Sequence, residues 1–259
     1  MTAPVALITG AARGIGRATA LELARRGYRL ALVDLLGEEL TTLHAEALKI
    51  SGDLADLDFC QQAVDQTAAR FGQLDLLVNN AAWRKVETLR QTDVATWDRT
   101  LRVCLTAPAF LAKWAAEIMQ RQGRGVIVNV SSIRAHFSDG TAAAYVAAKG
   151  GIDALTHELA ALYGPRGIRV VAVAPGAIDT QLSADLAADD VMRDVAADCI
   201  DHTPLLRFGR PEEVARTIAW LASDDASFIT GTTIVADGGL SHHHYGQQLK
   251  QRMKPGEFG

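Results

Sequence analysis

Short, nearly continuous apolar runs alternate along this chain with longer amphipathic stretches, and this alternation restricts the fold more than any other feature. Runs that are apolar throughout are typical of parallel strands covered on both faces. Strands that alternate with helices form βαβ units. The sequence therefore predicts an α/β fold, a doubly wound parallel sheet of about seven strands with helices on both faces. The clearest runs cover residues 5–9, 29–34, 74–80, 125–132, 168–176 and 231–239.

The intervening stretches have the length and periodicity of helices. Residues 16–27, 56–72, 93–122, 142–164 and 211–223 are predicted to be helical. The segment between Asp34 and Asp53 is short, so the second crossover helix is expected to be abbreviated. No linker, repeat or low-complexity tract divides the chain. We therefore expect one catalytic domain over residues 1–240, followed by a polar, loop-like tail over residues 241–259 at a subunit interface or at the rim of the active site.

Charge and cysteine content exclude several classes of protein. The 259 residues carry a formal net charge of -4, whereas nucleic-acid binding requires a basic surface. No apolar run approaches the ~20 residues of a membrane helix, and the amino terminus has no signal-peptide pattern. Cys60, Cys104 and Cys199 are scattered, without metal-ligand spacing. A cytoplasmic protein with no metal, nucleic-acid or membrane partner is expected.

A glycine-rich turn joins the first strand to the first helix. In TGAARGIG, Gly10, Gly14, Ile15 and Gly16 are placed so that backbone N–H groups could approach a pyrophosphate at a helix amino terminus. The alternative interpretation is a tight strand–helix connection without a ligand. Its place after the first strand favours a dinucleotide site.

The residue that ends the second predicted strand bears on the choice of dinucleotide. Asp34 stands where a carboxylate can accept a hydrogen bond from the ribose 2′-hydroxyl of NAD, and it would repel the 2′-phosphate of NADP. Asp34 could also be a helix cap. Arg13 points the other way, because a cation there could bind the phosphate. The sequence predicts NAD over NADP.

A tyrosine and a lysine lie four residues apart in AYVAAKG. Positions i and i+4 share one helix face, so the ammonium of Lys149 can lie beside the phenol of Tyr145. A neighbouring cation favours the phenolate, which would make the tyrosine a general acid/base. By itself the pair is also compatible with two residues on a solvated helix face.

Taken in order, these motifs resemble the short-chain dehydrogenase/reductase family in its single-domain, NAD-dependent, Rossmann-like form. The resemblance runs from residue 5 to residue 239. It rests on TGAARGIG (9–16), NNAA (79–82), NVSS (129–132), YVAAK (145–149), APGAIDT (174–180), RFGRPEEVA (207–215) and ITGTTIVADGG (229–239).

The resemblance implies the catalytic residues. Ser132 would be the catalytic serine, with Ser131 its structural neighbour. Tyr145 would exchange a proton with the substrate oxygen, and Lys149 would lower its pKa and hold the nicotinamide ribose. The resemblance also implies cofactor contacts: Asp53 at the adenine ring, and Asn79 and Ala81 along the cleft. The full cofactor set is Gly10, Arg13, Gly14, Ile15, Gly16, Asp34, Asp53, Leu54, Asn80, Ala81, Tyr145, Lys149, Pro175, Gly176, Ile178 and Thr180.

One position departs from the family pattern in a way that bears on catalysis. Cys104 stands where the family usually has an asparagine, whose backbone carbonyl holds a water of the proton relay. Three interpretations stay open: a weakened relay, a loss of activity, and a reactive thiol. Ala82 and Val171 are smaller departures.

Residues after the catalytic motifs are expected to face the substrate. These are Trp83, Arg84, Arg134 and His136, and the two arginines are either a site for a carboxylate or polyhydroxylated substrate or surface charge at the rim. Residues 181–206 are expected to form a lid, with Leu182, Leu186 and Val191 over the substrate or on the core. The resemblance also implies a homodimer or homotetramer.

Three functions are compatible with this sequence. The first is an NAD-dependent dehydrogenase that transfers a hydride between the nicotinamide and a secondary alcohol or ketone, such as a sugar, polyol or hydroxy acid. The second is a 3-oxoacyl-type reductase, for which NADPH would be usual. The third is a non-catalytic NAD(H)-binding sensor, motivated by Cys104.

Overall fold

Seven parallel strands form one sheet in the computed structural model, which describes residues 2–180 and 190–258. Their order is β3-β2-β1-β4-β5-β6-β7. The predicted doubly wound, Rossmann-like sheet is therefore confirmed. The strands are β1 (Val5–Thr9), β2 (Arg29–Asp34), β3 (Leu48–Ser51), β4 (Leu76–Asn79), β5 (Gly125–Val130), β6 (Ile168–Pro175) and β7 (Thr233–Ala236).

Strand β3 is the one strand that no apolar run predicted. It is the edge strand beside β2, and of its four residues only Ile50 is buried. An edge strand of this kind carries polar residues, so its sequence, LKIS, does not stand out. The short helix that precedes it, α2 (Gly37–Thr41), is the abbreviated crossover that was expected.

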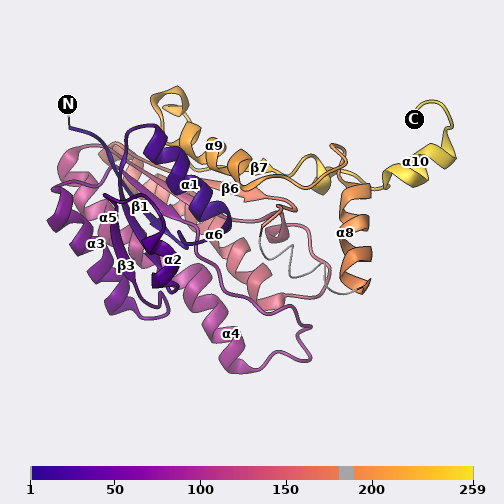
Figure 1. Ribbon diagram of the computed structural model, residues 1–259, viewed down its shortest axis with the longest axis horizontal. Coiled ribbons are helices and arrows are strands. Elements are labelled where there is room, and N and C mark those ends of the chain that lie inside the picture. The colour runs from indigo at the N-terminus through magenta and orange to yellow at the C-terminus, as the bar shows by residue number, and fades with distance from the viewer. Residues whose placement is uncertain (1, 181–189, 259) are drawn as a thin grey trace.

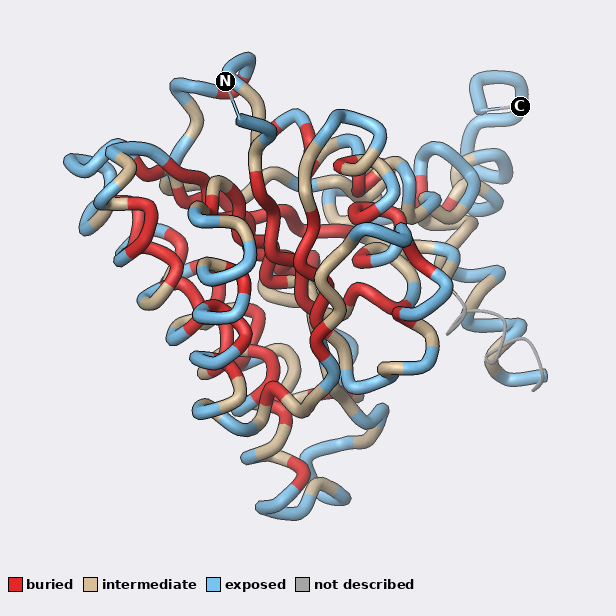
Figure 2. The backbone as a smooth tube through the Cα atoms, turned by 60° about the vertical axis from the view of Figure 1, so that its left-hand side comes forward, coloured by how far each residue is buried: buried red, intermediate tan, exposed pale blue. Residues whose placement is uncertain are grey.

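Helices cover both faces of the sheet (Figure 1). One face packs against α3, α5 and α6, and the other packs against α1 and α9. Figure 2 shows the buried residues concentrated along the central strands between these layers. The bounds are α1 (Gly14–Arg25), α3 (Leu57–Phe71), α4 (Val94–Leu101), α5 (Ala107–Gln122), α6 (Ala143–Tyr163), α8 (Asp190–His202), α9 (Pro211–Leu221) and α10 (Gln247–Met253).

The long helix predicted over residues 93–122 is interrupted in its middle. Helices α4 and α5 are separated by a π-helical turn over Arg102–Thr106, which contains Cys104. Pro108 lies four residues after Cys104 and has no N–H, so it cannot donate the α-helical hydrogen bond to the Cys104 carbonyl. The proline therefore accounts for a break at this point, and π turns are frequent at functional sites.

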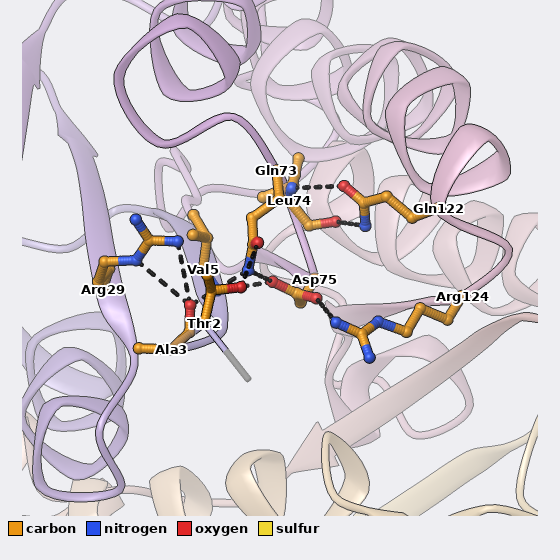
Figure 3. Close-up of polar contacts among 9 residues, drawn as sticks. All are labelled: Thr2, Ala3, Val5, Arg29, Gln73, Leu74, Asp75, Gln122 and Arg124. Carbon is orange, nitrogen blue, oxygen red and sulfur yellow. Dashed lines mark hydrogen bonds and ion pairs between the residues drawn. The ribbon is translucent and has the colours of Figure 1, made fainter.

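Polar contacts tie the amino ends of the strands together, on the edge opposite the cleft described below (Figure 3). Asp75 accepts hydrogen bonds from the backbone N–H of Val5 at 2.8 Å and from Gln73 Nε2 at 2.8 Å. Gln122 at the end of α5 pairs with both backbone groups of Leu74, at 2.9 Å each. These bonds fix β1 and β4 beside each other, where the strand order reverses.

Helix α8 and the carboxyl-terminal tail are less closely packed on the sheet than the other helices. Leu182 and Leu186 of the predicted lid lie outside the described residues, and Val191 on α8 is 65% exposed. The tail, predicted as a loop, contains α10, which lies beyond α8 and away from the sheet (Figure 1). The backbone N–H of Gln248 donates to Asp201 at 2.9 Å, so the tail is joined to the body through α8.

Candidate active site

A cleft of about 430 Å³ opens at the carboxyl ends of the strands, around the point where the strand order reverses between β1 and β4. This is where doubly wound sheets bind ligands, and the volume is in the range of ligand pockets. Trp83, Arg99 and Val103 form part of its wall. Among the residues predicted to bind the cofactor, those that line it are Gly10, Arg13, Gly14, Asp34, Asp53, Leu54, Asn80, Ala81 and Thr180.

The glycine-rich turn is built so tightly that its glycines cannot be replaced. Gly10 and Gly14 have φ of 65° and 53°, in the left-handed region. A Cβ at Gly16 would lie 2.0 Å from the Gly10 carbonyl oxygen, and a Cβ at Gly10 would lie 2.8 Å from the Cα of Ala81. The backbone therefore lies open to the cleft at the amino end of α1, as binding of a pyrophosphate requires.

Two neighbouring asparagines have different roles. Asn80 holds the turn, because its Nδ2 donates to the carbonyls of Thr9 at 2.9 Å and Gly10 at 3.0 Å. The prediction that Asn79 lines the cleft is wrong. Its side chain is buried and donates to Asn129 Oδ1 at 2.9 Å, because β4 alternates its side chains between the two faces of the sheet.

Asp34 ends β2 with both carboxylate oxygens fixed at the cleft. Oδ2 accepts from the backbone N–H of Ala12 at 2.9 Å, and Oδ1 accepts from that of Leu36 at 3.0 Å. Arg13 lies on the same side and forms a two-bond ion pair with Glu39 of α2, with Nε at 2.5 Å from Oε2. The negative charge of Asp34 is thus presented to the cleft, while the charge of Arg13 is balanced.

Asp53 stabilises a turn and also lines the cleft. Its Oδ1 accepts from the backbone N–H of Ala55 at 2.9 Å, and its Oδ2 accepts from Arg99 at 2.9 Å. The hydrogen bond from Ala55, with that from Arg99, lowers the pKa of the Asp53 carboxyl. The Arg99 guanidinium also lies 5.3 Å from the ring centroid of Trp83, so the three side chains brace one end of the cleft.

Tyr145 and Lys149 lie on α6, and Tyr145 packs on the cluster that contains Val103 of the cleft wall. Lys149 is 2% exposed, and its Nζ donates to the Val130 carbonyl at 2.6 Å while lying 5.5 Å from the centroid of the Tyr145 ring. Ser132 follows β5, is 8% exposed, and accepts a hydrogen bond from the backbone N–H of Arg134 at 3.1 Å. The i, i+4 pair is therefore not on a solvated face: its lysine is buried next to the tyrosine.

Cys104 faces the loop that follows β4. Its thiol donates to the Trp83 carbonyl at 3.3 Å, and its sulfur accepts from the Trp83 N–H at 3.3 Å. The side chain is 1% exposed and packs with Val103 and Ala148, near Tyr145. Burial of this kind argues against the interpretation of Cys104 as a reactive thiol.

Several of the predicted cofactor residues support the cleft without lining it. Ile15 packs on the core beneath the turn. Pro175 is buried at the end of β6, and a Cβ at Gly176 would lie 2.7 Å from the Cβ of Asp237. Ile178 forms a parallel bridge with Gly209.

Of the four residues expected to face the substrate, Trp83 lies in the cleft wall, and the other three have different surroundings. Arg134 forms a two-bond ion pair with Asp139 at 2.6 and 2.5 Å, and His136 Nε2 lies 2.9 Å from the buried carboxylate of Asp153. Arg84 instead lies with its guanidinium carbon 5.1 Å from the centroid of the Tyr145 ring. Within residues 2–180 and 190–258, no carboxylate forms an ion pair with Arg84.

Sequence reasoning missed two charged residues that pair with side chains lining the cleft. Arg99 pairs with Asp53, and Glu39 pairs with Arg13. Both come from helices whose exposed charges look alike in sequence. For Glu39 the signal was the carboxylate pair Glu38–Glu39 close after Asp34, but only the fold shows which of the two faces Arg13.

Comparison with known proteins agrees with this geometry. A family profile described as "Enoyl-(Acyl carrier protein) reductase" matches residues 10–241. The chain therefore belongs to the short-chain dehydrogenase/reductase family, as the motifs indicated. Its members are oxidoreductases that act on alcohol or ketone groups with a nicotinamide cofactor, and the glycine cradle, Asp34 and the Tyr145–Lys149 pair are residues that fit such a cofactor.

Among curated proteins, the chain is 43% identical over 244 residues to a cis-4-hydroxycyclohexanecarboxylate dehydrogenase from Sinomonas cyclohexanicum, covering 92% of this chain and 96% of that protein. It is 35% identical to a 3-oxoacyl-[acyl-carrier-protein] reductase of Synechocystis, over 93% and 98% of the two chains. Among solved structures, it is similar to levodione reductase, with a TM-score of 0.87 at 35% identity over 93% and 98% of the chains. The ligand-free aldohexose dehydrogenase of Thermoplasma acidophilum gives a TM-score of 0.86 at 31% identity over 93% and 95%.

None of the helices in residues 2–180 and 190–258 combines the length and the hydrophobicity that a membrane span requires.

Proposed function

We propose that this protein is an NAD-dependent dehydrogenase that interconverts a secondary alcohol and a ketone on a substrate that also carries a carboxylate. The observation that carries the proposal is the pairing of the buried Lys149 with Tyr145, in a chain that also has a buried Ser132 after β5 and a glycine-lined cleft. The preference for NAD rests on Asp34, whose fixed carboxylate would accept from a ribose hydroxyl and repel a phosphate.

The residues divide the proton chemistry between them. Tyr145 takes the proton of the substrate hydroxyl, and the buried Lys149 holds its ammonium 5.5 Å from the centroid of the Tyr145 ring. Ser132 donates a hydrogen bond to the substrate oxygen as negative charge develops on it. The dinucleotide, when bound, supplies the hydride chemistry, and the chain's part is to orient it and the substrate.

Cys104 is compatible with this activity. The relay water of the family is held by a backbone carbonyl, and Pro108 leaves the Cys104 carbonyl without its α-helical donor. Two hydrogen bonds join the Cys104 thiol to the backbone of Trp83 and hold Cys104 in place. The backbone carbonyl of Cys104 therefore has a defined position. These features support a working relay over the interpretation as a non-catalytic sensor.

The carboxylate preference rests on Arg84. Arg134 and His136 are already matched by Asp139 and Asp153, whereas the Arg84 guanidinium lies over the Tyr145 ring. An arginine there can bind a carboxylate with two parallel hydrogen bonds while the hydroxyl of the same molecule meets Tyr145. The similarity to a dehydrogenase named for cis-4-hydroxycyclohexanecarboxylate supports a hydroxy acid over a sugar or polyol.

Matched substrates test this proposal. Oxidation of a hydroxy acid and of its methyl ester would be compared in the wild type, in Arg84→Ala and in the control Arg134→Ala. We expect Arg84→Ala to raise KM for the acid by about tenfold and to leave the ester unchanged. Equal KM values for acid and ester in the wild type would contradict the carboxylate assignment, but not the dehydrogenase activity.

The relatives that reduce 3-oxoacyl groups define the alternative. That activity would show as reduction of a 3-oxoacyl thioester with NADPH in preference to NADH. Such a result would contradict the proposed cofactor and substrate together.

A further inference from the structure

We propose that Glu39 is a second determinant of dinucleotide choice, which acts by holding Arg13 in an ion pair and so withholding its charge from the 2′-phosphate of NADP. The inference rests on the proposed function, because it assumes a nicotinamide dinucleotide in the cleft. It extends that function by assigning cofactor selectivity to a residue that does not itself line the cleft.

Arg13 is the cation best placed to bind a 2′-phosphate. It is the residue before Gly14, at the amino end of α1, and it lines the cleft together with Asp34 and Leu35. Without a counter-charge it would favour NADP, opposing Asp34. The two residues would then give the site a mixed preference.

Glu39 resolves this conflict in favour of NAD. Its carboxylate meets Arg13 through two hydrogen bonds, with Nε at 2.5 Å from Oε2, in the fork geometry that arginine and carboxylates favour. The hydrogen bond from Arg13, with a smaller contribution from the charge of Arg17, lowers the pKa of the Glu39 carboxyl. Glu39 is therefore ionised at neutral pH, and a phosphate would have to displace it and also meet its negative charge.

Among the described residues, Glu39 pairs with Arg13 and is also influenced by the charge of Arg17, one turn along α1. Asp34 accepts a hydrogen bond from the backbone N–H of Ala12, the residue before Arg13. Because both members of the Arg13–Glu39 pair are partly exposed, with side chains 51% and 35% accessible, each charge has a modest effect in water. Removal of the ion pair should accordingly change the relative affinity for NADH and NADPH by a few-fold.

The chain provides a matched control for this residue. Glu38 is the neighbouring glutamate on the same short helix and is exposed, and no ion pair joins it to Arg13 among the described residues. Removing its charge alters the net charge as much as removing that of Glu39. A difference between Glu38→Gln and Glu39→Gln therefore reports the contact with Arg13 and not the general field.

Dissociation constants for NADH and NADPH would be measured by titration calorimetry in the wild type, Glu38→Gln, Glu39→Gln and the double variant Arg13→Gln/Glu39→Gln. In the wild type NADH should bind more tightly. Glu39→Gln should tighten NADPH binding by about fivefold with little change for NADH, and the gain should vanish in the double variant. Glu38→Gln should change the ratio by less than about twofold.

Two results would contradict this inference without contradicting the proposed function. One is a ratio of NADH to NADPH dissociation constants in Glu39→Gln equal to that in Glu38→Gln. The other is a gain in NADPH affinity in Glu39→Gln that is still present in the double variant Arg13→Gln/Glu39→Gln. Binding of neither dinucleotide by the wild type would contradict the proposed function, and this inference with it.

Discussion

The thiol of Cys104 is joined to the backbone of Trp83 by two hydrogen bonds, one donated to the carbonyl and one accepted from the N–H, each 3.3 Å long. A side-chain amide at this position could make the same two contacts, because it also has a donor and an acceptor. The substitution of cysteine for the family's asparagine therefore keeps a polar link between the π turn and the loop after β4.

Loss of this link should destabilise the protein. Cys104→Ala leaves the partly buried N–H of Trp83 without its partner, which we expect to lower the free energy of unfolding by about 1–2 kcal/mol and to reduce kcat. Cys104→Asn should retain both. Denaturant unfolding and turnover measure the effects, with Cys199→Ala as the control for loss of a thiol. Equal stability of Cys104→Ala and the wild type would show that the two bonds contribute nothing.

Pro108 should matter for turnover more than for stability. Pro108→Ala supplies an N–H that can bond to the Cys104 carbonyl, in competition with the relay water. We expect kcat to fall by up to about tenfold while the free energy of unfolding stays equal or rises. Pro211→Ala, at the first turn of α9, is the matched control. Wild-type kcat in Pro108→Ala would argue against a role for this carbonyl.

Gly16 should not tolerate a methyl group. In Gly16→Ala the new Cβ would lie 2.0 Å from the Gly10 carbonyl oxygen, so the turn must open. We expect loss of dinucleotide binding together with a lower melting temperature. Gly164→Ala has no atom within 4 Å of the new Cβ and should melt at or slightly above the wild-type temperature. A Gly16→Ala protein that binds NADH normally would contradict the assignment of this turn to the cofactor.

Glu22 should contribute stability that is lost in acid. Its hydrogen bond from Arg25, together with that from Arg26, lowers the pKa of its carboxyl from 4.5 to about 2. A lowered folded-state pKa stabilises the protein above the unfolded pKa, and the contribution disappears as pH falls from 4.5 to about 2.

The matched comparison is Glu22→Gln against the wild type, with the exposed Glu46→Gln as control. At pH 7 the Glu22→Gln protein should be less stable by up to about 1 kcal/mol, and the difference should shrink as the pH falls below ~4.5. Thermal unfolding at several pH values measures it. A difference that stays constant with pH would show that the ion pairs of Glu22 are not its cause.

Most of the fold could be predicted from the sequence because buried parallel strands are apolar throughout. Strand β3 was not predicted from the sequence, because an edge strand needs only one buried residue, here Ile50. The break in the helix at Arg102–Thr106 was not predicted either. Pro108 lies inside the predicted helix, where a proline removes a hydrogen bond, but the apolar pattern continues past it.

The residues of the site also fall into those that the sequence predicts and those that only the fold shows. The Tyr145–Lys149 spacing and the glycine turn are local, so the sequence contains them. Long-range pairs are not local: which acid meets Arg13, which base meets Asp53, and why Arg134 is matched while Arg84 lies over Tyr145 depend on the approach of separate helices and loops.

We propose that Tyr145 and Lys149 act together in an NAD-dependent oxidation of a hydroxy acid. The most direct measurement is the appearance of NADH when the purified protein is mixed with NAD and a panel of hydroxy acids, sugars, polyols and simple secondary alcohols. Tyr145→Phe and the control Tyr163→Phe, on the same helix, would be measured alongside. We predict turnover with hydroxy acids that falls at least about 100-fold in Tyr145→Phe and is unchanged in Tyr163→Phe. If the wild type forms no NADH with any compound of the panel but still binds NADH, the proposed dehydrogenase activity is contradicted. That result would favour a non-catalytic NAD(H)-binding sensor.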